Sequence, residues 1–161
     1  MNLSTNFQAI ERKFLVKFLP DDLVNMASSF CERYYLYTDD SVELRIQRKG
    51  DQYEMERKVA GTHSWVRDSF KAKMTEKEFL HLQKSVIGNP VLFEKYRVSS
   101  SPNVSIKKYS GHVDGFMLAE VDFPTLEEAQ LFQPFDWLGR EISDESFSRD
   151  SGLIHLSASP L

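Results

Sequence analysis

The stretch QAIERKFLV, residues 8–16, places Glu11 and Lys13 two positions apart at the start of a run of large apolar residues. In an extended strand alternate side chains point to the same face, so Ala9, Glu11 and Lys13 would share one face. A carboxylate and an ammonium group side by side on an early strand suit either solvent or a charged interior. The faces of the other strands decide between these two.

The composition bounds the class of protein. The chain has 161 residues, 41% of them apolar and 27% charged, so we expect one globular domain over residues 1–161. A net charge of −4 argues against a general nucleic-acid binder. The single cysteine, Cys31, cannot form an internal disulfide, and neither a leader peptide nor an apolar run of ~20 residues is visible. We therefore expect a cytoplasmic protein with no contact to membranes.

Most segments predict strands, because they alternate with period two or are rich in aromatic and β-branched residues. Helices are predicted over 75–88, where Thr75 and Glu78 form a capping box and Gly88 ends the helix, and over 124–132, where Thr125 and Glu128 form a second one. A short helix or helical turn is expected within 19–30. The predicted strands cover residues 9–18, 32–39, 41–59 (two strands joined around Gly50), 65–74, 91–99, 104–111 and 115–123. The sequence therefore predicts an antiparallel α+β domain of about eight strands.

Nearly every predicted strand has one apolar face and one charged face. For a single strand, solvent exposure of the charged face explains this, since antiparallel strands with one face in solvent are common. A sheet of this size tends to curl or close, however. If the charged faces point inward, the domain is a barrel with an ionic lumen, which is favourable only if the lumen holds a charged ligand.

The chain resembles the triphosphate tunnel metalloenzymes, also called CYTH proteins, over residues 7–147. The segment AIERKFLV is similar to their Glu-x-Glu-x-Lys signature, and the similarity continues in VELRIQRKG, YEMERK, FEKYRV and GFMLAEVDFPTLEEAQLFQPFDWLGREISDE. It is closest to short bacterial members that hydrolyse inorganic triphosphate. The resemblance implies an eight-stranded antiparallel β-barrel, a tunnel with a charged lumen and a few helices outside. It also implies that lumen carboxylates hold Mg²⁺ or Mn²⁺.

Carried over residue by residue, the resemblance implies phosphate binding by Lys13, Arg45, Lys58, Arg67, Lys95 and Arg97. It implies catalytic and metal-binding roles for Glu11, Glu120 and Asp122. At five positions where the family carries carboxylates this chain has Ala9, Ser69, Lys71, Ser105 and Lys107, and Gln47 replaces a family arginine. Glu54 and Glu56 are either relocated metal ligands or partners for Lys71 and Lys107, and all four are further candidate lumen residues.

On this alignment nine basic side chains and six acidic ones point inward: Lys13, Arg45, Lys58, Arg67, Lys71, Lys73, Lys95, Arg97 and Lys107 against Glu11, Glu43, Glu54, Glu56, Glu120 and Asp122. A positive lumen in an acidic protein suits an anionic ligand. We expect a metal-dependent phosphohydrolase that binds inorganic triphosphate or a short polyphosphate. The alternative is a catalytically inactive, metal-independent anion-binding protein of the same fold, and a nucleotide-acting relative is a third possibility. The sequence gives no indication of the oligomeric state.

Overall fold

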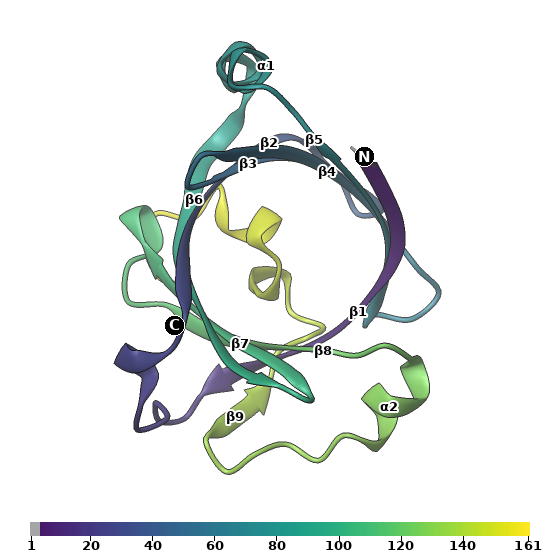
Figure 1. Cartoon of the computed structure of the whole chain (residues 1–161), viewed down its shortest axis with the longest axis vertical. Helices are drawn as coiled ribbons and strands as arrows, with labels where there is room; N and C mark the ends of the chain where they lie inside the picture. The colour runs from purple at the N-terminus through teal and green to yellow at the C-terminus, as the bar shows by residue number, and fades with distance from the viewer. Residues whose placement is uncertain (1–3) are drawn as a thin grey trace.

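The computed structural model, which describes residues 4–161, contains a closed antiparallel β-barrel (Figure 1). Eight strands are hydrogen-bonded in the order β5-β4-β3-β2-β6-β7-β8-β1, and pairing of β1 with β5 closes the ring. A ninth strand pairs with β1 outside it. The strands are β1 (Ser4–Val16), β2 (Ser28–Thr38), β3 (Val42–Lys49), β4 (Gln52–Ala60), β5 (Val66–Lys73), β6 (Ile87–Ser100), β7 (Asn103–Ser110), β8 (Met117–Asp122) and β9 (Leu138–Glu141). The predicted eight-stranded barrel is confirmed.

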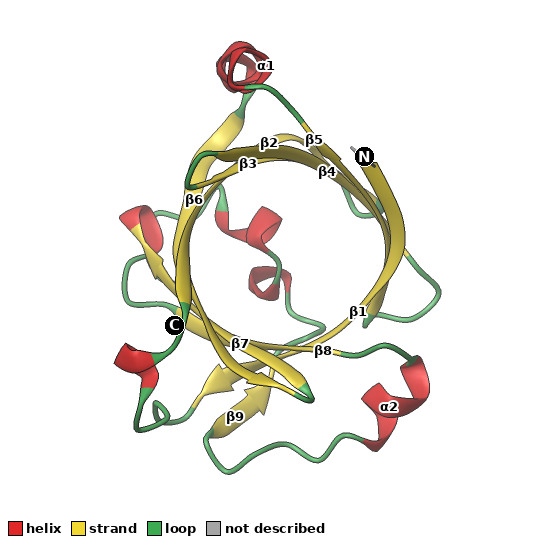
Figure 2. Ribbon diagram, in the orientation of Figure 1, coloured by secondary structure: helices red, strands yellow, loops and turns green. Residues whose placement is uncertain are grey.

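The helices are short and lie outside the barrel wall, apart from those of the C-terminal segment (Figure 2). The capping box of Thr75 and Glu78 starts the first helix, as predicted, but this helix and the 3-10 turn after it end at Ser85. Gly88, the predicted helix end, lies within β6. Thr125 accepts a hydrogen bond from the Glu128 amide, without the reciprocal bond of a capping box. The helices are α1 (Glu76–Leu82), α2 (Leu126–Leu131) and the 3-10 turns η1 (Leu23–Asn25), η2 (Gln83–Ser85), η3 (Gly111–Val113), η4 (Ser146–Ser148) and η5 (Asp150–Leu153).

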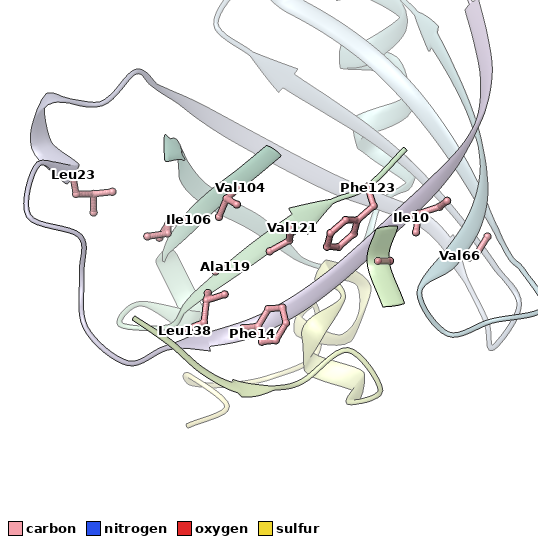
Figure 3. Packing of buried hydrophobic residues seen from close by; sticks show 11 residues of the cluster. Ile10, Phe14, Leu23, Val66, Val104, Ile106, Ala119, Val121, Phe123 and Leu138 are labelled. Atoms are coloured by element: carbon pink, nitrogen blue, oxygen red, sulfur yellow. The ribbon is translucent and has the colours of Figure 1, made fainter. Parts of the chain in front are cut away.

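The outer face of one side of the barrel carries a hydrophobic core (Figure 3). Phe14 on β1, Ile106 on β7 and Val121 on β8 are buried there, and β9 and α2 supply Leu138 and Ala129. Along β1, β7 and β8 the side chains of this core therefore point outward and are covered, while Lys13, Lys107 and Glu120 point inward and line the cavity. This arrangement leaves the lumen free for polar groups.

The C-terminal segment after β9 folds back and closes one end of the barrel, where Figure 1 shows it in yellow inside the ring. Leu153 and Ile154 are fully buried in a second core, which includes Tyr35 and Phe93. Gly88 permits this approach, because a Cβ on it would lie 2.7 Å from the Ile154 carbonyl oxygen and its φ is +65°. We call this segment, residues 142–156, the plug. The barrel is therefore closed at the end that the plug covers.

None of the helices within residues 4–161 has the length and apolar character needed to cross a membrane.

Replacing Leu153 by alanine should lower the free energy of unfolding by about 2–5 kcal/mol, because it leaves a cavity between the plug and the barrel. The matched control is Leu80→Ala, on the exposed surface of α1, which should change it by no more than about 0.5 kcal/mol. Urea unfolding measures both values. Equal effects of the two substitutions would mean that the plug does not stabilise the fold.

Candidate functional site

The barrel encloses a cavity of about 300 Å³. Nine basic side chains and five acidic ones line it: Lys13, Arg33, Arg45, Lys49, Lys58, Arg67, Lys71, Lys95 and Lys107 against Glu11, Glu56, Glu120, Asp122 and Asp150. The cavity opens to solvent at the end opposite the plug, where the side chains of Lys49, Lys71 and Lys95 are about one third exposed. An excess of four positive groups lines a cavity in a protein whose net charge is −4. Such a cavity favours anions.

The structure brings most of the candidate residues together. Those that line the cavity are Glu11, Lys13, Arg45, Glu56, Lys58, Arg67, Lys71, Lys95, Lys107, Glu120 and Asp122. Glu54 does not line it, but it lies 3.8 Å from Lys71 at the mouth. Arg97 is exposed and lines a neighbouring hollow instead. Lys73 is exposed as well and does not line the cavity.

Four lysines surround the carboxylates of Glu11 and Glu120. The Lys13 ammonium group lies 3.8 Å from Glu11 and 4.0 Å from Glu120. The other contacts are Lys58 to Glu11 at 3.3 Å and, to Glu120, Lys95 at 3.7 Å and Lys107 at 3.9 Å. These distances are long for charge-assisted hydrogen bonds, so the lysines compensate the carboxylates without being firmly fixed by them.

Asp122 is the least compensated of the three candidate metal ligands. Its backbone pairs with that of Glu11 across β1 and β8, while Lys13 pairs with Glu120. Burial raises the pKa of Asp122 to about 7, and the negative charges of Glu11 and Glu120 act in the same direction. A cation bound near these three carboxylates would relieve their mutual repulsion.

The donor set fits one divalent ion. Three carboxylates are ligands that Mg²⁺ and Mn²⁺ accept, and the negative charges of Glu11 and Glu120 add to burial in raising the pKa of Asp122. Within residues 4–161, no three Asp, Glu, His or Cys side chains are already arranged so that they could hold a metal ion. Glu11 and Glu120 instead contact the lysines. A second ion has no ligands at Ser69, Lys71, Ser105 and Lys107, where the family resemblance leads one to expect carboxylates.

Arg45 and Arg67 form shorter ion pairs than those of the four lysines with Glu11 and Glu120. Arg45 lies 2.5 Å from Glu56, whose other oxygen accepts a hydrogen bond from the Ser69 hydroxyl. Arg67 donates to Glu43 at 2.8 Å. Although burial opposes it, Arg45 lowers the pKa of Glu56 far below its usual value. Glu56 is therefore the partner of an arginine and not of Lys107.

A buried cluster that was not predicted from the sequence lies at the closed end of the cavity. Asp150, on η5 of the plug, accepts hydrogen bonds from Arg33 at 2.6 Å, from the Tyr109 hydroxyl at 2.6 Å and from Lys107 at 2.8 and 2.9 Å. Burial alone would raise the pKa of Asp150, but Lys107 and Arg33 keep it well below its usual value. Two of the cavity's cations thus share one carboxylate of the plug.

A sequence signal existed for only part of this cluster. Arg33 shares one face of β2 with Cys31 and Tyr35. The alternation of side chains used for the other strands would therefore have placed it in the lumen. Asp150 lies in an irregular polar segment, and no local pattern indicates that it enters the barrel. Lys49 continues the alternating series of Arg45 and Gln47 on β3, so the same alternation predicts that its side chain points into the lumen.

No protein-family model matches the chain, but individual known proteins are similar to it. The inorganic triphosphatase of Nitrosomonas europaea is 30% identical over 146 residues, which cover 89% of this chain and 95% of that protein. A solved structure of an inorganic triphosphatase has a TM-score of 0.64 and 28% identity, over 90% of this chain and 96% of that one.

More distant structures share the fold. A protein from Hippeastrum, described as having a dominant triphosphatase activity, has a TM-score of 0.54 and 10% identity, over 76% of this chain and 82% of that one. The identity to the Nitrosomonas protein extends over nearly the whole of both chains, and the closed barrel with its charged cavity is the fold that the sequence resemblance implied. The chain therefore belongs to the triphosphate tunnel metalloenzyme, or CYTH, family.

Proposed function

We propose that residues 1–161 form a single tunnel domain that binds inorganic triphosphate, or a short polyphosphate, and hydrolyses it with the help of one divalent metal ion. The observation that carries this proposal is the cavity with nine basic side chains, closed at one end and open at the other. The 30% identity to an inorganic triphosphatase, over nearly the full length of this chain, supports the choice of substrate. We expect the protein to act in the cytoplasm, since its one cysteine is free and buried.

The lysines are the side chains best suited to hold the phosphate oxygens. Lys13, Lys58 and Lys95 make ion pairs of 3.3–4.0 Å, so an incoming anion can replace their carboxylate partners at little cost. Arg45 and Arg67 are held at 2.5 and 2.8 Å by Glu56 and Glu43. They supply fixed positive charge at the wall of the cavity and offer their remaining N–H groups to the anion.

Hydrolysis adds one water molecule across a P–O–P linkage. The water oxygen forms a bond to phosphorus, the bridging P–O bond breaks, and orthophosphate and pyrophosphate leave. The barrier falls when fixed positive groups stabilise the charge that develops on the transferred and leaving oxygens, and the lysines and arginines of the cavity wall are placed to do so. A divalent ion held by Glu11, Glu120 and Asp122 would add Lewis-acid stabilisation of a phosphoryl oxygen.

Replacing Glu120 by glutamine should lower kcat/KM for triphosphate by about 100-fold or more, because the change removes a metal-ligating charge at nearly constant volume. Glu127→Gln, in the exposed first turn of α2, is the matched control and should leave turnover unchanged. Phosphate release with Mg²⁺ or Mn²⁺ measures both. Wild-type turnover in Glu120→Gln would remove this carboxylate from the reaction.

Chelation of the metal should separate binding from turnover. With EDTA, phosphate release should stop, while triphosphate should still raise the melting temperature, because the lysines and arginines bind the anion without a metal. Orthophosphate at equal ionic strength is the control for nonspecific salt effects.

Two other results would point elsewhere. A melting shift without turnover under any metal would establish the alternative, a metal-independent anion-binding protein. The absence of both turnover and shift would mean that the carboxylates of the lumen satisfy its cations completely, and the proposed ligand would be wrong.

A further inference from the structure

A small cavity lies between the plug and the loop that joins β4 to β5, and its volume is about 20 Å³. Ser148 and Arg149 of the plug line it on one side, and Ser64 of the loop lines it on the other. Because Ser64 is exposed, the cavity reaches solvent there. We call it the side passage.

The inner end of the side passage opens on the main cavity. Ala9, Glu11, Lys13 and Arg67 line both of them. The short side chain of Ala9 leaves this junction open, since a longer one would extend into the shared space. The side passage therefore leads from solvent to the carboxylate of Glu11 without crossing the mouth of the barrel.

The size and lining of the side passage suit water. A cavity needs about 10–15 Å³ to hold one water molecule and two to four polar groups to bind it. The hydroxyl groups of Ser64 and Ser148 supply polar partners. The half-buried guanidinium group of Arg149 forms no ion pair within residues 4–161, so its charge depends on water for solvation. The passage admits single water molecules and is too narrow for phosphate.

The geometry of hydrolysis requires water at this end of the cavity. Triphosphate enters through the mouth, because the plug closes the other end, so one terminal phosphoryl group lies deepest. In phosphoryl transfer the attacking and leaving oxygens lie roughly in line on opposite sides of the phosphorus. With pyrophosphate leaving toward the mouth, the water must approach from the plug. The bound anion itself blocks the way from the mouth to that position.

We propose that the side passage supplies the water that attacks triphosphate, and that Arg149 limits the size of the molecule that can enter. The water oxygen bonds to the deepest phosphorus, the bridging P–O bond on the mouth side breaks, and the proton that the water loses ends on the pyrophosphate. The inference rests on the proposed function, because it requires triphosphate in the main cavity. It assigns to the plug a part in choosing the attacking molecule.

The test offers methanol as a competing attacking molecule, since methanol converts triphosphate to methyl phosphate and pyrophosphate. Pockets distinguish molecules that differ by one methylene group by about 10–200-fold. The wild-type protein in aqueous methanol should therefore form orthophosphate almost exclusively. Arg149→Ala widens the passage and should raise the ratio of methyl phosphate to orthophosphate about tenfold or more. Phosphorus NMR of the products measures this ratio.

The matched control is Arg97→Ala, which removes the same exposed type of side chain from the hollow beside the mouth. It should leave the product ratio at the wild-type value. The ratio does not depend on how tightly or how fast a variant turns over its substrate, so a weakened variant still gives an answer. Ser148→Gly enlarges the passage from the plug side and should change the ratio in the same direction as Arg149→Ala.

Three results would overturn the inference. A wild-type ratio in both Arg149→Ala and Ser148→Gly would mean that the attacking molecule does not use the side passage. A rise in Arg97→Ala equal to that in Arg149→Ala would place its entry at the mouth. The absence of phosphate release from the wild-type protein with any metal would contradict the proposed function and the inference with it, whereas release with unchanged ratios contradicts the inference alone.

Discussion

A charge enclosed by the barrel must be compensated within the barrel, and this constraint governs the rest of the structure. Leaving one buried charge without its partner typically costs about 3–5 kcal/mol, so the cavity is stable only because its basic groups face carboxylates. Arg45 has Glu56, Arg67 has Glu43, and Lys107 has Asp150. The excess of positive groups that remains is the driving force for binding an anion. The same ion pairs that permit the empty cavity must be exchanged for contacts with the ligand when the cavity is filled.

The apolar side chains follow from this arrangement. Because the inner faces of the strands carry charge, the outer faces must supply a hydrophobic core, and α2 and β9 cover Phe14 and Val121 there. The plug provides a second core at the closed end, where Leu153 and Ile154 pack beside the ion pairs of Asp150. One segment thus contributes apolar contacts that stabilise the fold and a carboxylate that pairs with two cations. The plug links the stability of the barrel to the charge of its cavity.

The strand faces could be predicted from the sequence because alternation is a local property. It placed Arg45, Lys58 and Glu120 in the lumen, and the family resemblance supplied the closure of the sheet that propensity alone does not give. The short helix or helical turn predicted within 19–30 is the turn η1, and β2 already begins at Ser28. Pairings such as that of Arg33 with Asp150 depend on segments far apart in the chain. They result from the packing of Leu153 and Ile154, which no local pattern reveals.

The place of β1 in the ring has a consequence for how the chain folds. The first strand pairs with β5 through its first half and with β8 through its second. Glu11 must therefore pair with Asp122, far along the chain, before the sheet can close. Contacts between residues so distant in sequence form slowly, because much chain entropy is lost before they are made. Until then β5 and β8 expose unpaired edges, which can associate with those of other chains. Folding yield should therefore fall with protein concentration more steeply than for a domain of equal size whose neighbouring strands follow one another in sequence.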